Sequence, residues 1–272
     1  IEVFEKYVPI NQLLDKLMNF ENKILTPRMF QYDLVRRASV SKKRIVLPEG
    51  YDTRILEAAS RLIENNLVEI ILLGEESKIK VKAAESGIQL NFDKLTIINP
   101  VEYVHFDDYV NTIYELRKHK NVNMDIAHDL MLDVSYFGTM MIYKGHADGM
   151  VSGAVHTTQH TIRPALQFIK TKPDVNIVSS IFFMCLEDRV SIFGDCAINP
   201  NPTAEELAEI AISSAQSSLA FGIEPKIAML SYSSGSSGQG EDVDRVREAT
   251  EIVKRKRPDL KIEGPIQYDA AV

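Results

Sequence analysis

The sequence predicts an α/β fold of two domains with mainly parallel sheets. Short, almost wholly apolar strands such as Arg44–Pro48 alternate with amphipathic helices, a pattern typical of parallel sheets covered on both faces. The chain has 272 residues, 45% hydrophobic and 25% charged, the composition of a globular protein with room for two domains. The turn-rich segment Lys172-Pro-Asp174 separates the two halves of the pattern. We therefore expect domains at residues 26–172 and 173–272, after a linker or the tail of an upstream domain at residues 1–25.

In the first half, capping residues and apolar spacing predict the elements in order. A short amphipathic helix is expected around Leu13–Met18, and a second helix starts at Pro27, a residue favoured at the first helical position. Asp52 follows the first strand and is placed to cap the next helix. The elements expected after it are the strand Val68–Leu73, a helix around residues 78–84, the strand Leu95–Ile98, and helices over residues 109–119 and 125–143.

The second half shows the same alternation. Thr203 and Glu206 form a capping box for a helix over residues 204–221, which Gly222 ends. The other elements expected here are the strands Val178–Met184, Val190–Phe193, Lys226–Ser231 and Lys261–Tyr268 and a helix over residues 242–257. Because no helix is expected after the last strand, we expect the second domain to be incomplete at its C-terminus.

Charge and hydropathy exclude several classes of function. The net charge of −7 argues against a nucleic-acid surface, because no long basic run offsets repulsion from a phosphate backbone. No apolar run is long enough to span a membrane, and no signal peptide is evident, so we expect a cytoplasmic protein. Cys185 and Cys196 match no zinc spacing, and we expect both to be buried, reduced thiols.

The strongest functional signal lies between Asp148 and Pro164. A buried strand leads into a loop of glycine and hydroxyl residues and then to Arg163, in the first turn of a helix. Small residues let backbone N–H groups approach an anion closely, and a guanidinium group matches the geometry of a phosphate. We therefore expect a site for a phosphorylated metabolite. Its candidate residues are Ser152, Gly153, Thr157, Thr158, Thr161 and Arg163.

A second loop, Ser231–Gly240, follows another apolar strand and also leads into a helix N-terminus. Ligands of open α/β sheets collect at the carboxyl ends of the strands, so Ser233, Ser234 and Gly235 are further candidates for substrate binding. The loop lacks the Gly-Lys-Ser/Thr ending of a P-loop. A flexible solvent loop explains it equally well.

Other polar residues give weaker signals. His156 and His160 are four residues apart, but no carboxylate ligand follows at a useful distance, so we expect no metal site. By its periodicity, Arg117 belongs to a solvated helix face. Asp148 and Asp195 follow apolar strands, where a role in a cleft and a role in a turn or cap are both open.

Several distinctive stretches together resemble phosphate acetyltransferases (phosphotransacetylases), in particular the catalytic region of the long bacterial type. The resemblance runs from about residue 26 to the end, and the residues before it look like the close of the regulatory domain of the long enzymes. The matching stretches are Thr26-Pro-Arg-Met-Phe30, Lys43-Arg-Ile-Val-Leu-Pro-Glu-Gly50, Tyr114-Glu-Leu-Arg-Lys-His-Lys120, Ala147-Asp-Gly-Met-Val-Ser-Gly-Ala154, Thr161-Ile-Arg-Pro164, Gly194-Asp-Cys-Ala-Ile-Asn-Pro200, Ala228-Met-Leu-Ser-Tyr-Ser233 and Asp269-Ala-Ala-Val272.

The resemblance implies acetyl transfer between coenzyme A and phosphate, with acetyl-CoA and acetyl phosphate as the acetylated partners. It implies no tightly bound cofactor, a homodimer or larger homo-oligomer, and an active site in an interdomain cleft. The implied fold is related to that of isocitrate and isopropylmalate dehydrogenases. The resemblance also makes Arg117 and Arg163 catalytic residues, a role that periodicity alone does not assign to Arg117.

One departure from the family bears on activity. The family places a catalytic serine–arginine pair and an aspartate base in a Leu-Ser-Arg-Gly motif with acidic residues after it, and no such motif occurs in this sequence. We therefore expect the chain alone to be inactive. A phosphate butyryltransferase and a non-catalytic acetyl-CoA-sensing domain, of the kind fused to malic enzymes, are the alternatives. A hydroxy-acid dehydrogenase of the related fold would need a metal-binding aspartate cluster and a nicotinamide site, and we find neither in the sequence.

Overall fold

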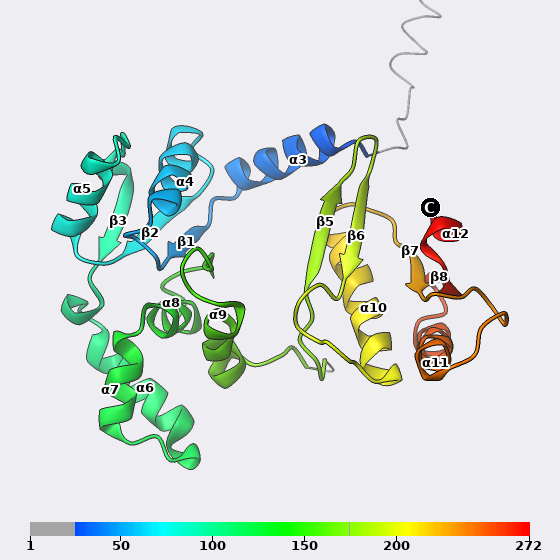
Figure 1. Ribbon diagram of the computed structural model, residues 1–272. Coiled ribbons are helices and arrows are strands. Elements are labelled where there is room, and N and C mark those ends of the chain that lie inside the picture. The colour runs from blue at the N-terminus through cyan, green and yellow to red at the C-terminus, as the bar shows by residue number, and fades with distance from the viewer. Residues whose placement is uncertain (1–24, 174) are drawn as a thin grey trace, which may run out of the picture. The chain divides into compact units, whose positions relative to one another are not determined.

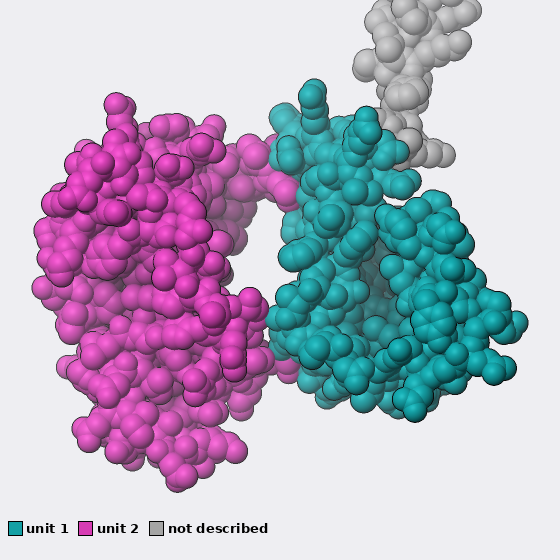
Figure 2. Space-filling view, in the orientation of Figure 1, with its two compact units in different colours: residues 1–32, 175–272 teal, residues 33–174 magenta. Residues whose placement is uncertain are grey.

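The computed structural model describes residues 25–173 and 175–272, which form two compact units (Figure 2). One unit is residues 33–174, and the other joins the described residues up to Tyr32 to residues 175–272. Helix α3 (Pro27–Val40) begins in one unit and ends in the other, whereas the sequence predicts it wholly within the first domain. The helix predicted around Leu13–Met18 lies outside the described residues.

The unit of residues 33–174 is built on a four-stranded sheet, in the order β3-β2-β1-β4, in which every pair is parallel. Figure 1 labels the first three of these strands. The strands are β1 (Arg44–Leu47), β2 (Glu69–Leu73), β3 (Leu95–Ile98) and β4 (Gly149–Met150). The apolar run of β2 is buried from Ile70 to Leu73, and that of β1 at Val46 and Leu47, as expected for the inner strands of a parallel sheet with both faces covered. The predicted α/β class with a mainly parallel sheet is confirmed.

Helices cover both faces of this sheet. They are α4 (Thr53–Glu64), α5 (Glu76–Glu85), α6 (Phe106–Arg117), α7 (Met124–Leu132), α8 (Val134–Tyr143) and α9 (Thr158–Pro164). Ile70 and Leu72 of β2 pack with α4 and α5, whereas Ile71 and Leu73 belong to the cluster formed by α6, α7 and α8. Alternate residues of a strand point to opposite faces, so one apolar strand supplies both halves of the core.

The predicted single helix over residues 125–143 is two helices, α7 and α8. Asp133 separates them with an extended backbone (φ −77°, ψ 123°), and its side chain accepts hydrogen bonds from the amides of Ser135 and Tyr136. A short carboxylate that bonds the first amides of a helix favours a helix start over a helix interior. The apolar spacing continues across Asp133, which is why periodicity missed the break.

The second unit contains two strand pairs. Strands β5 (Ile181–Cys185) and β6 (Val190–Gly194) are antiparallel, and β7 (Lys226–Leu230) and β8 (Lys261–Ile266) are parallel. The helices of this unit, besides the start of α3, are α10 (Ala204–Ala220), α11 (Glu241–Lys256) and the short α12 (Tyr268–Ala271). The predicted strand to Tyr268 therefore ends at Ile266, and a helix follows it after all.

The core of this unit lies between α10, α11 and the β7–β8 pair, with Ala208, Met229 and Ala249 among its buried residues. The predicted capping box is present, because Thr203 and Glu206 each accept a hydrogen bond from the backbone amide of the other. Both thiols are free, but neither is buried: Cys185 is exposed, since it ends β5 directly before the turn of the hairpin, and Cys196 is half-buried. No helix in the described parts of the chain has the length and apolar character needed to cross a bilayer.

Candidate functional site

The predicted site residues fall into two groups, one in each unit. In the unit of residues 33–174, Ser152 and Gly153 follow β4, Thr157 caps α9, and Arg117 ends α6. The remaining members of this group, all within α9, are Thr158, Thr161 and Arg163. The serine–glycine loop with Ser233, Ser234 and Gly235 belongs to the other unit. Each group is described by itself.

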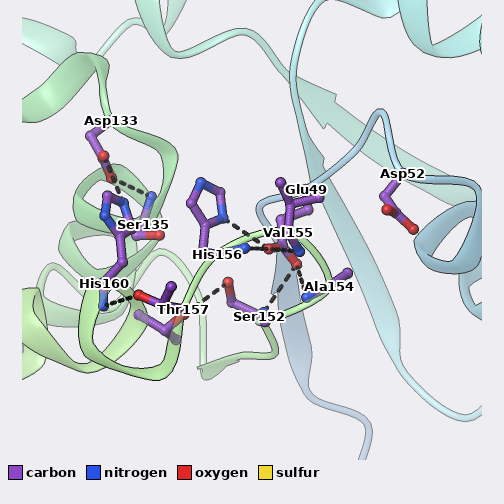
Figure 3. A network of polar contacts seen from close by, with 12 residues as sticks. Glu49, Asp52, Asp133, Ser135, Ser152, Ala154, Val155, His156, Thr157 and His160 are labelled. Atoms are coloured by element: carbon purple, nitrogen blue, oxygen red, sulfur yellow. Dashed lines mark hydrogen bonds and ion pairs between the residues drawn. The ribbon is translucent and has the colours of Figure 1, made fainter.

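The backbone of the first loop is organised around Glu49, a residue that we did not predict as part of the site. Its carboxylate accepts hydrogen bonds from four consecutive amides: Gly153 (3.1 Å), Ala154 (2.8 Å), Val155 (2.7 Å) and His156 (2.8 Å) (Figure 3). Burial opposes ionisation of this carboxyl, but the amide hydrogen bonds outweigh it and lower its pKa to about 2. Glu49 is therefore a buried anion, with 5% of its surface exposed.

This arrangement corrects one part of the sequence interpretation. The amides of residues 153–156 do bind an anion, but that anion is a side chain of the same protein and not an external phosphate. The hydroxyls of the loop and of α9 have weaker internal contacts: Thr161 Oγ1 lies 3.4 Å from Ser152 Oγ, and Thr157 Oγ1 accepts from the His160 amide at 3.3 Å. These side chains, and not the loop backbone, are the groups that could bind a ligand.

Two imidazoles connect the loop to α8. His156 Nδ1 lies 2.8 Å from Glu49 Oε1, and the ring of His156 stacks on that of His160 with centroids 4.7 Å apart. His160 Nε2 in turn lies 2.8 Å from Asp133 Oδ2. Each imidazole therefore faces a carboxylate, and within the described residues no group of three or more potential metal ligands is present.

Arg163 lies near the end of α9, directly before Pro164, and not in the first turn as the sequence suggested. The helix begins at Thr158 because the Thr157 side chain caps it. Pro164 cannot donate a backbone hydrogen bond, and the chain continues as a π-helical turn over Ala165–Ile169. Such wide turns are frequent at functional sites.

Arg117 and Arg163 both act electrostatically on the hydroxyl group of Tyr136. Burial raises the pKa of Tyr136, while the positive charges of Arg163 and Arg117 act in the opposite direction. Gln167, in the π-helical turn, accepts two hydrogen bonds. Its Oε1 accepts from the Tyr136 hydroxyl (3.1 Å), and its carbonyl oxygen accepts from Arg117 Nη1 (3.3 Å). The Nε of Arg117 is buried and has no hydrogen-bond partner among the described residues. Arg117 is thus not on a solvated helix face, and it retains a donor for a ligand.

The serine–glycine loop is tied down by hydrogen bonds of its own. Ser233 is buried, with its Oγ 2.9 Å from Ser237 Oγ; the Gly235 amide donates to the Pro265 carbonyl; and the Gln267 amide donates to Ser234 Oγ. The helix after the loop, α11, carries three acidic residues in its first turn. Their charges complement the helix dipole, so this helix start does not favour an additional anion.

The two aspartates whose role was open have structural contacts. Asp148 accepts from the backbone amide (2.8 Å) and the guanidinium group of Arg44. Asp195 accepts from the Ser180 amide (2.7 Å) and from the amides of Ile198 and Asn199 in the turn after β6. Asp195 therefore has the turn role, whereas Asp148 joins the residue before β4 to the start of β1.

Comparisons with known proteins agree on one family. The family model described as phosphate acetyl/butaryl transferase matches residues 29–272. The phosphate acetyltransferase of Synechocystis sp. is 53% identical over the whole chain, and that of Corynebacterium glutamicum is 49% identical over 91% of the chain and 75% of its own length. The chain spans 39% of the Synechocystis relative and 38% of that from Nitratidesulfovibrio vulgaris.

Two solved structures resemble the chain. A phosphotransacetylase from Streptococcus pyogenes has a TM-score of 0.84 and 44% sequence identity, covering 91% of this chain and 75% of its own. The EutD phosphotransacetylase from Staphylococcus aureus has a TM-score of 0.80 and 43% identity, covering 89% of this chain and 74% of its own.

Proposed function

This chain belongs to the phosphate acetyl/butaryl transferase family, and we propose that the full-length protein transfers an acetyl group between coenzyme A and phosphate. The observation that carries the proposal is the pair of arginines whose positive charges both act on Tyr136, of which Arg117 has a buried Nε donor with no partner among the described residues. Two guanidinium groups that act on the same hydroxyl group suit a phosphate dianion. The acetyl specificity is supported by the names of the relatives.

The proposed chemistry is a direct displacement. The coenzyme A thiol loses its proton to a base, and the thiolate sulfur forms a bond to the carbonyl carbon of acetyl phosphate. The bond from that carbon to the bridging oxygen breaks, and phosphate leaves with the electron pair. Arg117 and Arg163 neutralise the charge that grows on the phosphate. Hydroxyls that could hold the remaining phosphate oxygens belong to Ser152, Thr157, Thr158 and Thr161.

Further parts of the proposal concern the partners and the second loop. Coenzyme A and phosphate are substrates here, not resident cofactors, and the protein is proposed to work as a homo-oligomer. Ser233, Ser234 and Gly235 remain candidates for substrate contact, as hydrogen-bonding groups rather than as a centre of positive charge.

The family's Leu-Ser-Arg-Gly motif does not occur in the 272 residues, so we propose that this chain by itself does not catalyse acetyl transfer.

The proposal is tested by assaying the full-length protein and the 272-residue chain with acetyl phosphate and coenzyme A, following the thioester absorbance. We expect turnover by the full-length protein and none by the chain. Butyryl phosphate in parallel tests the acyl preference. If the full-length protein binds acetyl-CoA in a calorimeter but transfers no acyl group, it is a sensing domain and the proposal is wrong. Robust turnover by the chain would contradict only the inactivity of the chain.

A further inference from the structure

Glu49 is placed to control the shape of the loop that carries the proposed phosphate-binding hydroxyls. It follows β1 at the carboxyl end of the sheet, and Gly153 lies 104 positions further along the chain. Each of its two carboxylate oxygens accepts hydrogen bonds from two backbone amides, and Oε1 also forms a hydrogen bond with His156 Nδ1. Every consecutive N–H from Gly153 to His156 is therefore directed at one buried carboxylate.

The opposite side of the same loop is bound as well. Arg54, near the start of α4, donates to the Ala154 carbonyl and pairs with Asp52 at 2.8 Å. The loop backbone is thus bound through its donors by Glu49 and through an acceptor by Arg54. Gly153 has φ +116°, in a region that favours glycine, so the residue type permits this backbone path and the contacts with Glu49 and Arg54 hold it.

Electrostatics explain why a carboxylate can stand beside a phosphate site. A bare negative charge close to a phosphate would weaken phosphate binding. Here five N–H groups face the Glu49 carboxylate. Their partial positive charges compensate part of its negative charge. The same hydrogen bonds orient the chain that leads from Ser152 to the Thr157 cap of α9, the helix that carries Arg163.

We propose that Glu49 is a positioning residue: its carboxylate is a built-in anion that fills the amide nest of residues 153–156 and so presents the hydroxyls of Ser152 and Thr157, and Arg163, to the substrate phosphate. The inference rests on the proposed function. It predicts that the nest, once emptied, binds a small carboxylate from solution. It also predicts that loss of Glu49 weakens phosphate recognition specifically and does not merely lower the amount of folded protein.

The kinetic test uses Glu49→Gln and Glu49→Gly in the full-length protein. An amide of the same shape lacks the charge and replaces one carboxylate oxygen, which accepts from two of the four amides, with an NH₂ donor. We expect KM for acetyl phosphate to rise about tenfold, the scale of one lost charge-assisted hydrogen bond, with KM for coenzyme A unchanged. The control is Asp148→Asn, which removes another carboxylate bound to a backbone amide, but at the amino end of the strands. It should leave both KM values unchanged.

The rescue test adds sodium formate to Glu49→Gly, with sodium chloride at equal ionic strength as the reference. Formate should raise the midpoint of thermal unfolding of this variant, because a ligand that binds only the folded state stabilises it, and should return KM for acetyl phosphate towards the wild-type value. Wild-type protein, whose amides are occupied, should show no formate-specific shift.

The outcomes separate the two proposals. An unchanged KM with a reduced active fraction would make Glu49 a structural brace and overturn the inference, as would the absence of formate-specific stabilisation. If Glu49→Gly does not fold, the KM of Glu49→Gln decides. If the wild-type protein transfers no acetyl group, the proposed function fails, while the thermal response to formate still tests whether the nest binds a carboxylate.

Discussion

At the scale of single residues, the candidate site depends on where charge is left unpaired. Arg163 is exposed, and the buried Nε of Arg117 has no partner among the described residues, whereas Arg44 and Arg54 are each engaged by an aspartate. A cation that retains free donors can receive a phosphate, and one already paired to a carboxylate cannot do so without losing that partner. This difference marks two of these four arginines as candidates for the reaction.

Arg163→Ala in the full-length protein should remove a charge-assisted contact to phosphate. We expect kcat/KM to fall roughly tenfold to a hundredfold, corresponding to about 1.5–3 kcal/mol. Steady-state kinetics with varied acetyl phosphate measure the loss. Arg61→Ala, an exposed arginine on α4, is the control and should retain wild-type kinetics. Equal kinetics for Arg163→Ala and wild type would remove Arg163 from the site.

At the scale of elements, some helix starts are fixed by local contacts alone, and others also make contacts with residues distant in the sequence. Asp52 and Thr203 cap α4 and α10 through residues two or three positions away. Local sequence therefore predicts both caps. Asp133 also caps a helix, but one of its oxygens faces His160 from α9. That second contact links the break between α7 and α8 to the candidate site.

Thr203→Ala should remove one half of the capping box of α10. The expected loss is about 1 kcal/mol of unfolding free energy, because an amide at the helix start loses its acceptor. Urea unfolding measures it. Gln216→Ala, at an exposed position inside α10, should change stability by less than about 0.5 kcal/mol. Equal effects of the two substitutions would show that the cap contributes nothing.

Asp133→Ala should destabilise α8 by about 0.5–2 kcal/mol through the lost cap. It should also release His160, which a purely local cap would not do. Urea unfolding measures the first effect, and the chemical shifts of the His160 ring protons at a fixed pH measure the second. Asp129→Ala, with an exposed side chain on α7, is the matched control. Unaltered His160 ring shifts in Asp133→Ala would contradict the link between the two.

At the scale of the whole molecule, the fold was more predictable than the site. Apolar strands alternating with capped helices predicted the parallel sheet of residues 33–174, because these signals are local. The contact between Glu49 and the loop spans more than a hundred residues, and that between Arg117 and Gln167 spans fifty. Neither leaves a periodic trace in the sequence. A glutamate directly after a buried strand was the only available signal for Glu49, and Arg117 was singled out by resemblance alone.

Acid stability is a property of the whole molecule that follows from its hydrogen-bonded carboxylates. For Glu49 and Asp195, burial raises the pKa, but hydrogen bonds outweigh it and lower the pKa to about 2 from ordinary values of 4.5 and 3.8. A lowered folded-state pKa stabilises the protein above the ordinary value, and this stabilisation is lost as pH falls through the folded-state value. The thermal midpoint should therefore drop between about pH 4.5 and pH 2.

The Glu49→Gln Asp195→Asn double variant supplies the control for acid stability. It should have a lower thermal midpoint than the wild type at pH 7 and a shallower decline on acidification. A decline as steep as that of the wild type would show that other groups govern acid unfolding.

The π-helical turn after Pro164 makes the length of this segment critical. Each residue of an α-helix advances the chain by about 100° around the axis. Deleting Leu166 would allow regular helical bonding, yet it would rotate Gln167 and the residues after it by that angle. Gln167 would then leave both Tyr136 and Arg117. A shortening that improves backbone regularity would therefore dismantle the support of the guanidinium pair, so insertions and deletions here should be tolerated far less than substitutions.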